Sequence, residues 1–249
     1  MNVVGSQLLF DGRRLCCEMM STASGYLLAI SSGQKSVMTY GARSIETAFV
    51  KQPLAGAVTI SSLGIEGDEH VYEHHGGPDM ALLIYPSEHY SYWRSVGLQL
   101  PDAAAMAENF TTVGLLETEV AIGDFISVGS VVVQVAQPRS PCFKLAARFG
   151  RKSLPVEMQT TGYTGYLVRV IEPGVCEAGD ALLHESGTAV DRISIADAGR
   201  ILNVDRHDIE GAQRLLSVAE LGETVRSTLT ARVAAGGQHG EDVDRLYLD

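Results

Sequence analysis

Residues 131–152 read VVVQVAQPRSPCFKLAARFGRK, and this stretch contains a strand signal followed by a helix signal. The strand must end at Pro138, which has no backbone N–H to donate, and Pro141 restricts the backbone just before Cys142. FKLAARF, closed by Gly150, predicts two helical turns. We therefore expect Cys142 on a stiff loop between the end of a strand and the start of a helix.

Short strand-like segments separated by Gly, Pro and Asp turns extend on both sides of this stretch. SIETAFV, residues 44–50, alternates as a half-buried strand should, and DFISV and VVVQVA flank the two-residue hairpin signal Gly129-Ser130. Many short strands with few helices favour a closed barrel over a doubly wound sheet. We predict a mostly β domain, a β-barrel, over residues 25–188, with one helix at PSEHYSYWRSV that has Pro86 in its first turn.

The two ends of the chain have different patterns. Residues 189–236 carry apolar residues at helical spacing in three segments, which predicts a small C-terminal three-helix unit and an α+β fold overall. Residues 1–24 show no sustained period, and we interpret them as a disordered arm or a start-site artefact. Residues 237–249 are a polar tail.

The composition excludes several classes of function. The chain has 249 residues, 19 Lys and Arg against 30 Asp and Glu, and a net charge of −11, which disfavours general binding to nucleic acid or an anionic membrane. No apolar run approaches the roughly 20 residues that cross a bilayer, and no secretory signal is recognisable, so we expect a cytoplasmic protein. The four cysteines, two of them adjacent, form neither a disulfide framework nor a zinc pattern.

A local excess of positive charge surrounds Cys142. No acidic residue occurs between Ser127 and Val156, whereas five cations do, which predicts an anion site within an acidic protein. The N-terminal end of a helix and nearby positive charges both stabilise a thiolate. Cys142 is therefore a candidate nucleophile or ligand to a soft metal. The alternative is a buried cysteine that packs as a small hydrophobe. We treat Cys16, Cys17 and Cys176 as inert. We expect Lys144 and Arg148 on one face of the helix. The five cations are Arg139, Lys144, Arg148, Arg151 and Lys152.

A second group of polar residues lies in GIEGDEHVYEHHGGPD, residues 64–79. His70 and His74 have the spacing of a helical metal pair, but the glycines and Pro78 make a helix improbable, so a solvated loop is the simpler interpretation. His75-Gly76-Gly77 could instead let backbone N–H groups approach an anion closely. The loops 108–109 and 160–165 also place polar groups at strand ends, where ordinary turns would explain them equally well.

Taken together, GIEGDEHVYEHHGGPDMALLIYPSEHYSYWR, ENFTTVGLLETEVAIGDFISVG and QPRSPCFKLAARFG resemble the MOSC family, named for the C-terminal domain of molybdenum cofactor sulfurase. The C-terminal helices resemble its YiiM-like branch, which confers resistance to 6-hydroxylaminopurine. The resemblance implies a β-barrel in which Cys142 carries sulfur or binds the molybdenum of a pterin cofactor. It also implies a cofactor pocket, lined by His75, Gly76, Gly77 and Asn109 and with the pterin phosphate near Arg139, Lys144 and Arg148.

Two positions depart from the family pattern. Met80 stands where the family usually has a basic residue, which removes one potential anion contact. Ala107 stands where the family usually has Gly, which brings the loop conformation before Asn109 into question. Neither change affects Cys142.

The leading functional hypothesis is a molybdenum-dependent oxidoreductase that reduces N-hydroxylated bases and related compounds to amines. The sequence has no Rossmann glycine pattern and no iron–sulfur cysteine set, so we expect a flavin-containing reductase as the electron donor. The alternative is a sulfur-carrier, or sulfurtransferase, module that holds a persulfide on Cys142. A cysteine hydrolase that pairs Cys142 with His75 is disfavoured, because no Asp or Asn partner for the histidine is evident. The three-helix unit leaves a homodimer possible.

Overall fold

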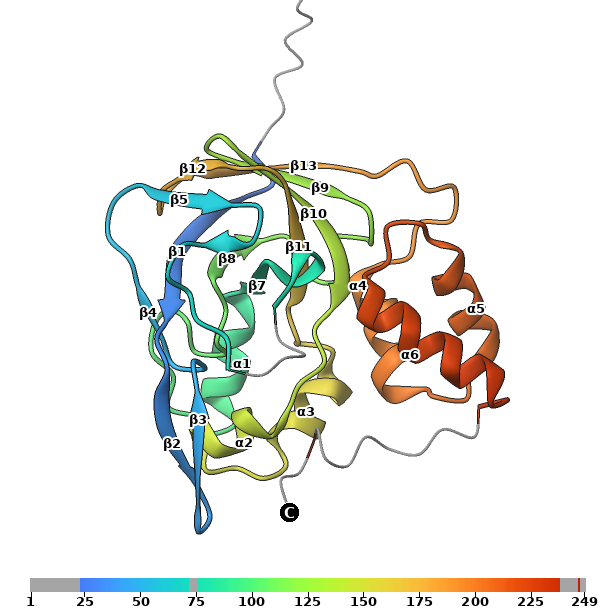
Figure 1. Cartoon of the computed structure of the whole chain (residues 1–249), viewed down its shortest axis with the longest axis horizontal. Coiled ribbons are helices and arrows are strands. Elements are labelled where there is room, and N and C mark those ends of the chain that lie inside the picture. Colours follow the sequence, from blue (N-terminus) through green and yellow to red (C-terminus); the bar gives the residue numbers. More distant parts are fainter. Residues whose placement is uncertain (1–22, 72–75, 238–245, 247–249) are drawn as a thin grey trace, which may run out of the picture.

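The computed structural model describes residues 23–71, 76–237 and Leu246. Its main body is a seven-stranded barrel, which confirms the predicted fold class (Figure 1). β1 pairs with both β8 and β13, and the second pairing closes the barrel. β7 and β8 run parallel, and the other barrel pairs run antiparallel. In hydrogen-bonding order the strands are β13 (Ala181–Glu185), β9 (Phe125–Val128), β10 (Val131–Pro138), β11 (Tyr166–Glu172), β7 (Leu82–Pro86), β8 (Phe110–Gly114) and β1 (Gly25–Gly33).

Shorter strands lie outside the barrel. β4 (Lys51–Pro53) extends the sheet beyond β1, and β12 (Gly174–Cys176), β5 (Val58–Ser61) and β6 (Gly64–Ile65) form a small sheet. β2 (Ser36–Tyr40) and β3 (Arg43–Thr47) make a hairpin that projects past the end of the barrel (Figure 1). The predicted alternation is confirmed for Ile45 and Thr47 of β3, but the strand ends at Thr47, and Ala48 and Phe49 beyond it are both buried.

The apolar core follows from the strand patterns. Val131, Val133 and Val135 of β10 are fully buried, and each contributes about 1.5 to 3 kcal/mol of burial free energy. The predicted hairpin is confirmed by pairing of Val131 with Val128 across Gly129-Ser130. A second apolar cluster contains Tyr85 and Trp93 and is associated with three helices: α1 (Glu88–Ser95), α2 (Phe143–Phe149) and α3 (Leu154–Thr161).

Two local predictions are wrong. Pro86 is the last residue of β7, and α1 begins two residues later at Glu88, because the strand pairing Pro86–Thr112 keeps the backbone extended. Thr160 and Thr161 do not belong to a loop but to the last turn of α3, which the sequence analysis did not predict. Gly162 ends α3 with φ of 75°, a conformation that glycine adopts readily.

The predicted three-helix unit is confirmed, with one difference. It contains α4 (Ile195–Gly199), α5 (Ile209–Ser217) and α6 (Glu223–Ala234). Ser194 caps α4 through the Asp197 N–H at 3.0 Å, as the sequence predicts for an N-capping serine. The expected first helix changes after α4 into a π-helical turn, η2 (Arg200–Val204).

The barrel and the helical unit are joined by specific hydrogen bonds. Arg169 of β11 donates to Asp79 at 2.8 Å and to the Glu220 carbonyl at 2.8 Å. Asp79 in turn accepts from the Glu223 N–H at 2.9 Å, the first residue of α6. The segment that follows Gly76-Gly77 is therefore held against the helical unit. No helix among the described residues is long and apolar enough to span a membrane.

Candidate functional site

Cys142 lies where the sequence analysis predicted. β10 ends at Pro138, the 139–141 loop follows, and Cys142 precedes the first turn of α2 in an extended conformation. Its carbonyl accepts from the Leu145 N–H at 3.0 Å, and the Arg139 N–H donates to the Gly165 carbonyl at 3.2 Å. Cys142 is 9% exposed, so its sulfur sits in a largely enclosed environment. The loop is thus fixed at both ends.

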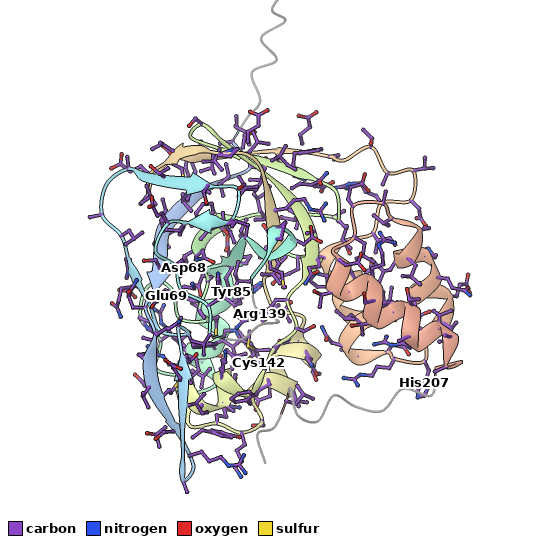
Figure 2. The ribbon with its side chains drawn as sticks, viewed as in Figure 1. Asp68, Glu69, Tyr85, Arg139, Cys142 and His207 are labelled. Atoms are coloured by element: carbon purple, nitrogen blue, oxygen red, sulfur yellow. The ribbon has the colours of Figure 1, made fainter. Side chains whose placement is uncertain are left out.

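Two of the predicted cations lie in the electrostatic environment of this thiol. Arg139 and Lys144 are both buried, and burial lowers the pKa of each, while a negative charge on Cys142 opposes that lowering. Nη1 of Arg139 is buried and has no hydrogen-bond partner within the described ranges. Figure 2 shows Arg139, Tyr85 and Cys142 in the barrel part of the molecule, well away from His207 on the helical unit.

The other predicted cations lie in different environments. Lys144 and Arg148 are about one helical turn apart on α2, as predicted, but Lys144 is buried whereas Arg148 is exposed. The difference has a simple geometric cause, because α2 turns its first half toward the core and its second half toward solvent. Arg151 bonds to Glu157 at 2.9 Å and to the Val96 carbonyl at 2.9 Å, which ties α3 to the end of α1.

Asn109 is held in a network of its own. Its amide nitrogen donates to the Ser31 carbonyl at 3.2 Å and to Asp68 at 2.8 Å, and its oxygen accepts from the Leu83 N–H at 3.0 Å. Both amide hydrogens are therefore used inside the protein. Asp68 also binds Lys51 at 2.6 Å. In this arrangement Asn109 fixes the side chain of Asp68.

Asp68 and His70 extend the site beyond the predicted residues. Partial burial lowers the pKa of His70; nearby Asp68 opposes this, while Lys51 and Lys144 act in the same direction as burial. The His70 ring packs on Gly76, where an added Cβ would lie 3.1 Å from its Cδ2 atom. Gly76 and Gly77 have φ values of 98° and 99°, which side chains other than glycine rarely tolerate. His74 and His75 lie outside the described residues.

Glu108 is a buried carboxyl next to this network. Tyr90 donates to it, and Thr111 and the Met106 N–H donate at 2.9 Å each. Burial raises the pKa of Glu108, and its charge in turn stabilises the protonated form of Arg139. The preceding Ala107 has φ of 68°, a left-handed conformation that glycine adopts more readily than alanine.

Comparison with known proteins places the chain in a family. The MOSC domain matches residues 71–183, and the YiiM-like 3-alpha helix domain matches residues 193–236. Protein YiiM of Escherichia coli is 38% identical over 197 residues, which cover 76% of this chain and 86% of YiiM.

This chain belongs to the MOSC family.

Solved structures and a further relative agree with that assignment. The crystal structure of YiiM from Geobacillus stearothermophilus is similar to this MOSC protein with a TM-score of 0.71 and 31% identity, over 84% of this chain and 99% of that chain. The crystal structure of YiiM from E. coli has a TM-score of 0.67 and 34% sequence identity, over 86% of this chain and 98% of that chain. A Gibberella moniliformis protein named reductase is 35% identical over 162 residues, which are 64% of this chain but 29% of that longer protein.

The site in this MOSC chain can hold an anion beside a thiol. It contains one buried cysteine, two buried cations and the Gly76-Gly77 pair, in which both glycines have positive φ. Within the part of the chain that the structure describes, no three His, Cys, Asp or Glu side chains cluster as a metal site. The sequence analysis did not include Asp68, His70 and Glu108 in the predicted cofactor site, although each lies in a polar segment that it named.

Proposed function

We propose that this MOSC protein binds a molybdenum cofactor through Cys142 and reduces N-hydroxylated bases, such as 6-hydroxylaminopurine, to amines. The observation that supports this most directly is the buried Nη1 of Arg139, which has no partner among the described residues and lies near a cysteine. A buried unpaired donor is costly, and a bound anion would satisfy it. A pterin cofactor offers a soft metal for the thiolate and a phosphate for the guanidinium.

The residues of the chain would act mainly by binding and orientation. Cys142 would be the protein ligand to the metal, and Arg139 and Lys144 would balance the negative charge. The backbone at Gly77, where an added Cβ would meet no described atom within 4 Å, would allow close approach. When bound, the cofactor supplies the two-electron reduction of the N–OH bond. In balance, R–NH–OH, two electrons and two protons give R–NH2 and water.

The electrons must come from outside this chain, and we propose a flavin-containing reductase as the donor. The similarity to a fungal protein named reductase supports an oxidoreductase activity for the family. A sulfur carrier is the second candidate, because the positive charges of the buried Arg139 and Lys144 would also attract the negative charge of a persulfide on Cys142. The two candidates predict different groups bound to the same sulfur atom.

Analysis of the purified protein separates the candidates. We expect about one molybdenum and one pterin per chain in the wild type and in Cys176→Ala, which removes a buried cysteine from β12 as a matched control. Cys142→Ala should lose both, together with the reduction of 6-hydroxylaminopurine by an artificial electron donor, and should stay folded.

Three outcomes would contradict the proposal. Labile sulfane sulfur on Cys142 without molybdenum would favour the carrier. Wild-type protein that holds molybdenum but reduces no hydroxylamino compound would exclude the reductase activity. A Cys142→Ala variant that unfolds readily and yet retains turnover would show that Cys142 is a core residue.

A further inference from the structure

The π-helical turn η2 brings the helical unit to the Cys142 loop. Its defining bond runs from the Asp205 N–H to the Arg200 carbonyl at 2.8 Å, five residues apart. Such turns are rare and occur frequently at functional sites. Arg232 of α6 donates to the Ile201 and Leu202 carbonyls at 2.7 Å each, so two carbonyls of the turn have a fixed partner. The turn is therefore built into the fold.

Asn203 is the polar side chain that this turn directs to the site loop. Its Oδ1 accepts from the Ser140 hydroxyl at 3.2 Å, and Ser140 lies between Arg139 and Cys142 in sequence. Asn203 is 7% exposed, and its Nδ2 is buried with no partner in the portion of the chain described. One end of the carboxamide is thus anchored at the loop, while the other end has two unused N–H donors.

Gln159 of α3 also has a buried amide nitrogen without a hydrogen-bond partner among the described residues. It is 8% exposed, and its Nε2 is buried and without a partner among the residues that the structure describes. α3 packs against both α2 and η2, so it lies between the helix that follows Cys142 and the turn that carries Asn203. An unmade hydrogen bond at a buried donor costs about 1 to 3 kcal/mol. Two such donors on neighbouring elements require an explanation.

We infer that Asn203 and Gln159 are specificity-determining residues that donate their amide hydrogens to acceptor atoms of the substrate. This inference rests on the proposed reductase function and deepens it. The substrate class would be N-hydroxylated heterocycles that carry a ring nitrogen or a carbonyl oxygen near the N–OH group. Simple aryl hydroxylamines, which lack such acceptors, would gain nothing from these donors. The helical unit then supplies one side of the substrate site.

The test compares two substrates in matched variants. Asn203→Asp keeps the shape of the side chain and an oxygen for Ser140 but removes both donors, and Asn203→Ala removes the group without adding charge. The control is Gln213→Glu, the same amide-to-acid change at an exposed position on α5. For each protein, kcat/KM is measured with 6-hydroxylaminopurine and with phenylhydroxylamine, and the molybdenum content is measured in parallel.

We expect the purine to lose at least about 10-fold more kcat/KM than phenylhydroxylamine in both Asn203 variants, which is the effect of about one buried hydrogen bond. The control should keep the wild-type ratio. Equal losses for the two substrates, or no loss at unchanged molybdenum content, would overturn the inference. If an Asn203 variant fails to fold, the ratio of the kcat/KM values for the two substrates in Gln159→Glu tests the inference instead.

A binding measurement separates this inference from the proposed reaction. If the wild type reduces neither substrate, the proposed function fails, and calorimetric binding of adenine to the wild type and Asn203→Ala then tests recognition alone. At least about 5-fold weaker binding to the variant would support the role of Asn203. Equal binding to the two proteins, or none to the wild type, would overturn it.

Discussion

Replacing Arg139 with Met should stabilise the cofactor-free protein while weakening cofactor binding. Arg139 is 8% exposed and its Nη1 is unpaired within the described ranges, so the folded apoprotein carries the cost of one buried unsatisfied donor. That cost is about 1 to 3 kcal/mol, and Met fills a similar volume without it. Attraction to the buried Glu108 offsets part of the gain. For a chain of this size, about 2 to 4 °C per kcal/mol converts that cost into a rise in Tm of at most roughly 2 to 12 °C.

The effect on the cofactor should have the opposite sign. A charge-assisted hydrogen bond to an anion contributes about 1.5 to 3 kcal/mol, so its loss should weaken cofactor affinity about 10- to 150-fold. Differential scanning calorimetry of metal-free Arg139→Met and wild-type protein, with molybdenum analysis of the holoproteins, measures both effects. Exposed Arg148→Met is the control and should change neither. A fall in the Tm of the Arg139→Met apoprotein would refute the reasoning, because it would make Arg139 a structural residue.

Three further predictions concern stability and reactivity. Ala107→Gly should raise the free energy of unfolding by about 1 kcal/mol in urea titrations, because it relieves a φ of 68°; a loss of stability would contradict this. Burial raises the pKa of Asp124, but hydrogen bonds from His184 and Arg192 outweigh it and hold that pKa well below its ordinary 3.8. The resulting stability is present above that ordinary value and is lost as pH falls toward the folded-state value. Chemical denaturation between pH 5 and about 2 should show this loss, and an equally steep loss in Asp124→Asn would exclude Asp124 as its source. Burial, with a smaller contribution from Asp180, raises the pKa of Cys176 to about 12, so peptide mapping after iodoacetamide at pH 8 should find it unmodified in folded protein and modified in urea.

Local patterns were sufficient to predict much of the fold. The prolines that end β10, the glycine that closes α2 and the two-residue hairpin at Gly129-Ser130 each specify a backbone conformation directly, and each lies where it was expected. α3 was missed, because the sequence analysis assigned no element to residues 154–159 and placed residues 160–165 in a loop. The π-turn was also missed; two of its carbonyls, those of Ile201 and Leu202, accept from Arg232, which lies 31 and 30 residues later in the chain.

The candidate site was predictable in part. Cys142, Arg139 and Lys144 come from one continuous stretch, so their proximity follows from the sequence. Asn203 and Gln159 come from separate elements; tertiary packing bonds Asn203 to Ser140 of the Cys142 loop and packs α3, which carries Gln159, against α2 and η2. For Asn109, the sequence suggested a contact with a ligand, whereas the structure shows bonds within the protein. A polar residue at a strand end suggests a ligand contact, but its bonds to Ser31, Leu83 and Asp68 use its hydrogen-bonding capacity within the protein.

The π-helical hydrogen bond joins Asp205 to Arg200, five residues earlier, so the number of residues in this segment determines which side chains face the Cys142 loop. Removing one residue there would restore the ordinary four-residue interval and rotate the following side chains by about 100° around the helix axis. A single-codon deletion or insertion could thus change which group faces Ser140 without touching the barrel. Homologues that differ in length at this point would then be expected to differ in the compounds they accept, even where their cysteine loops are identical.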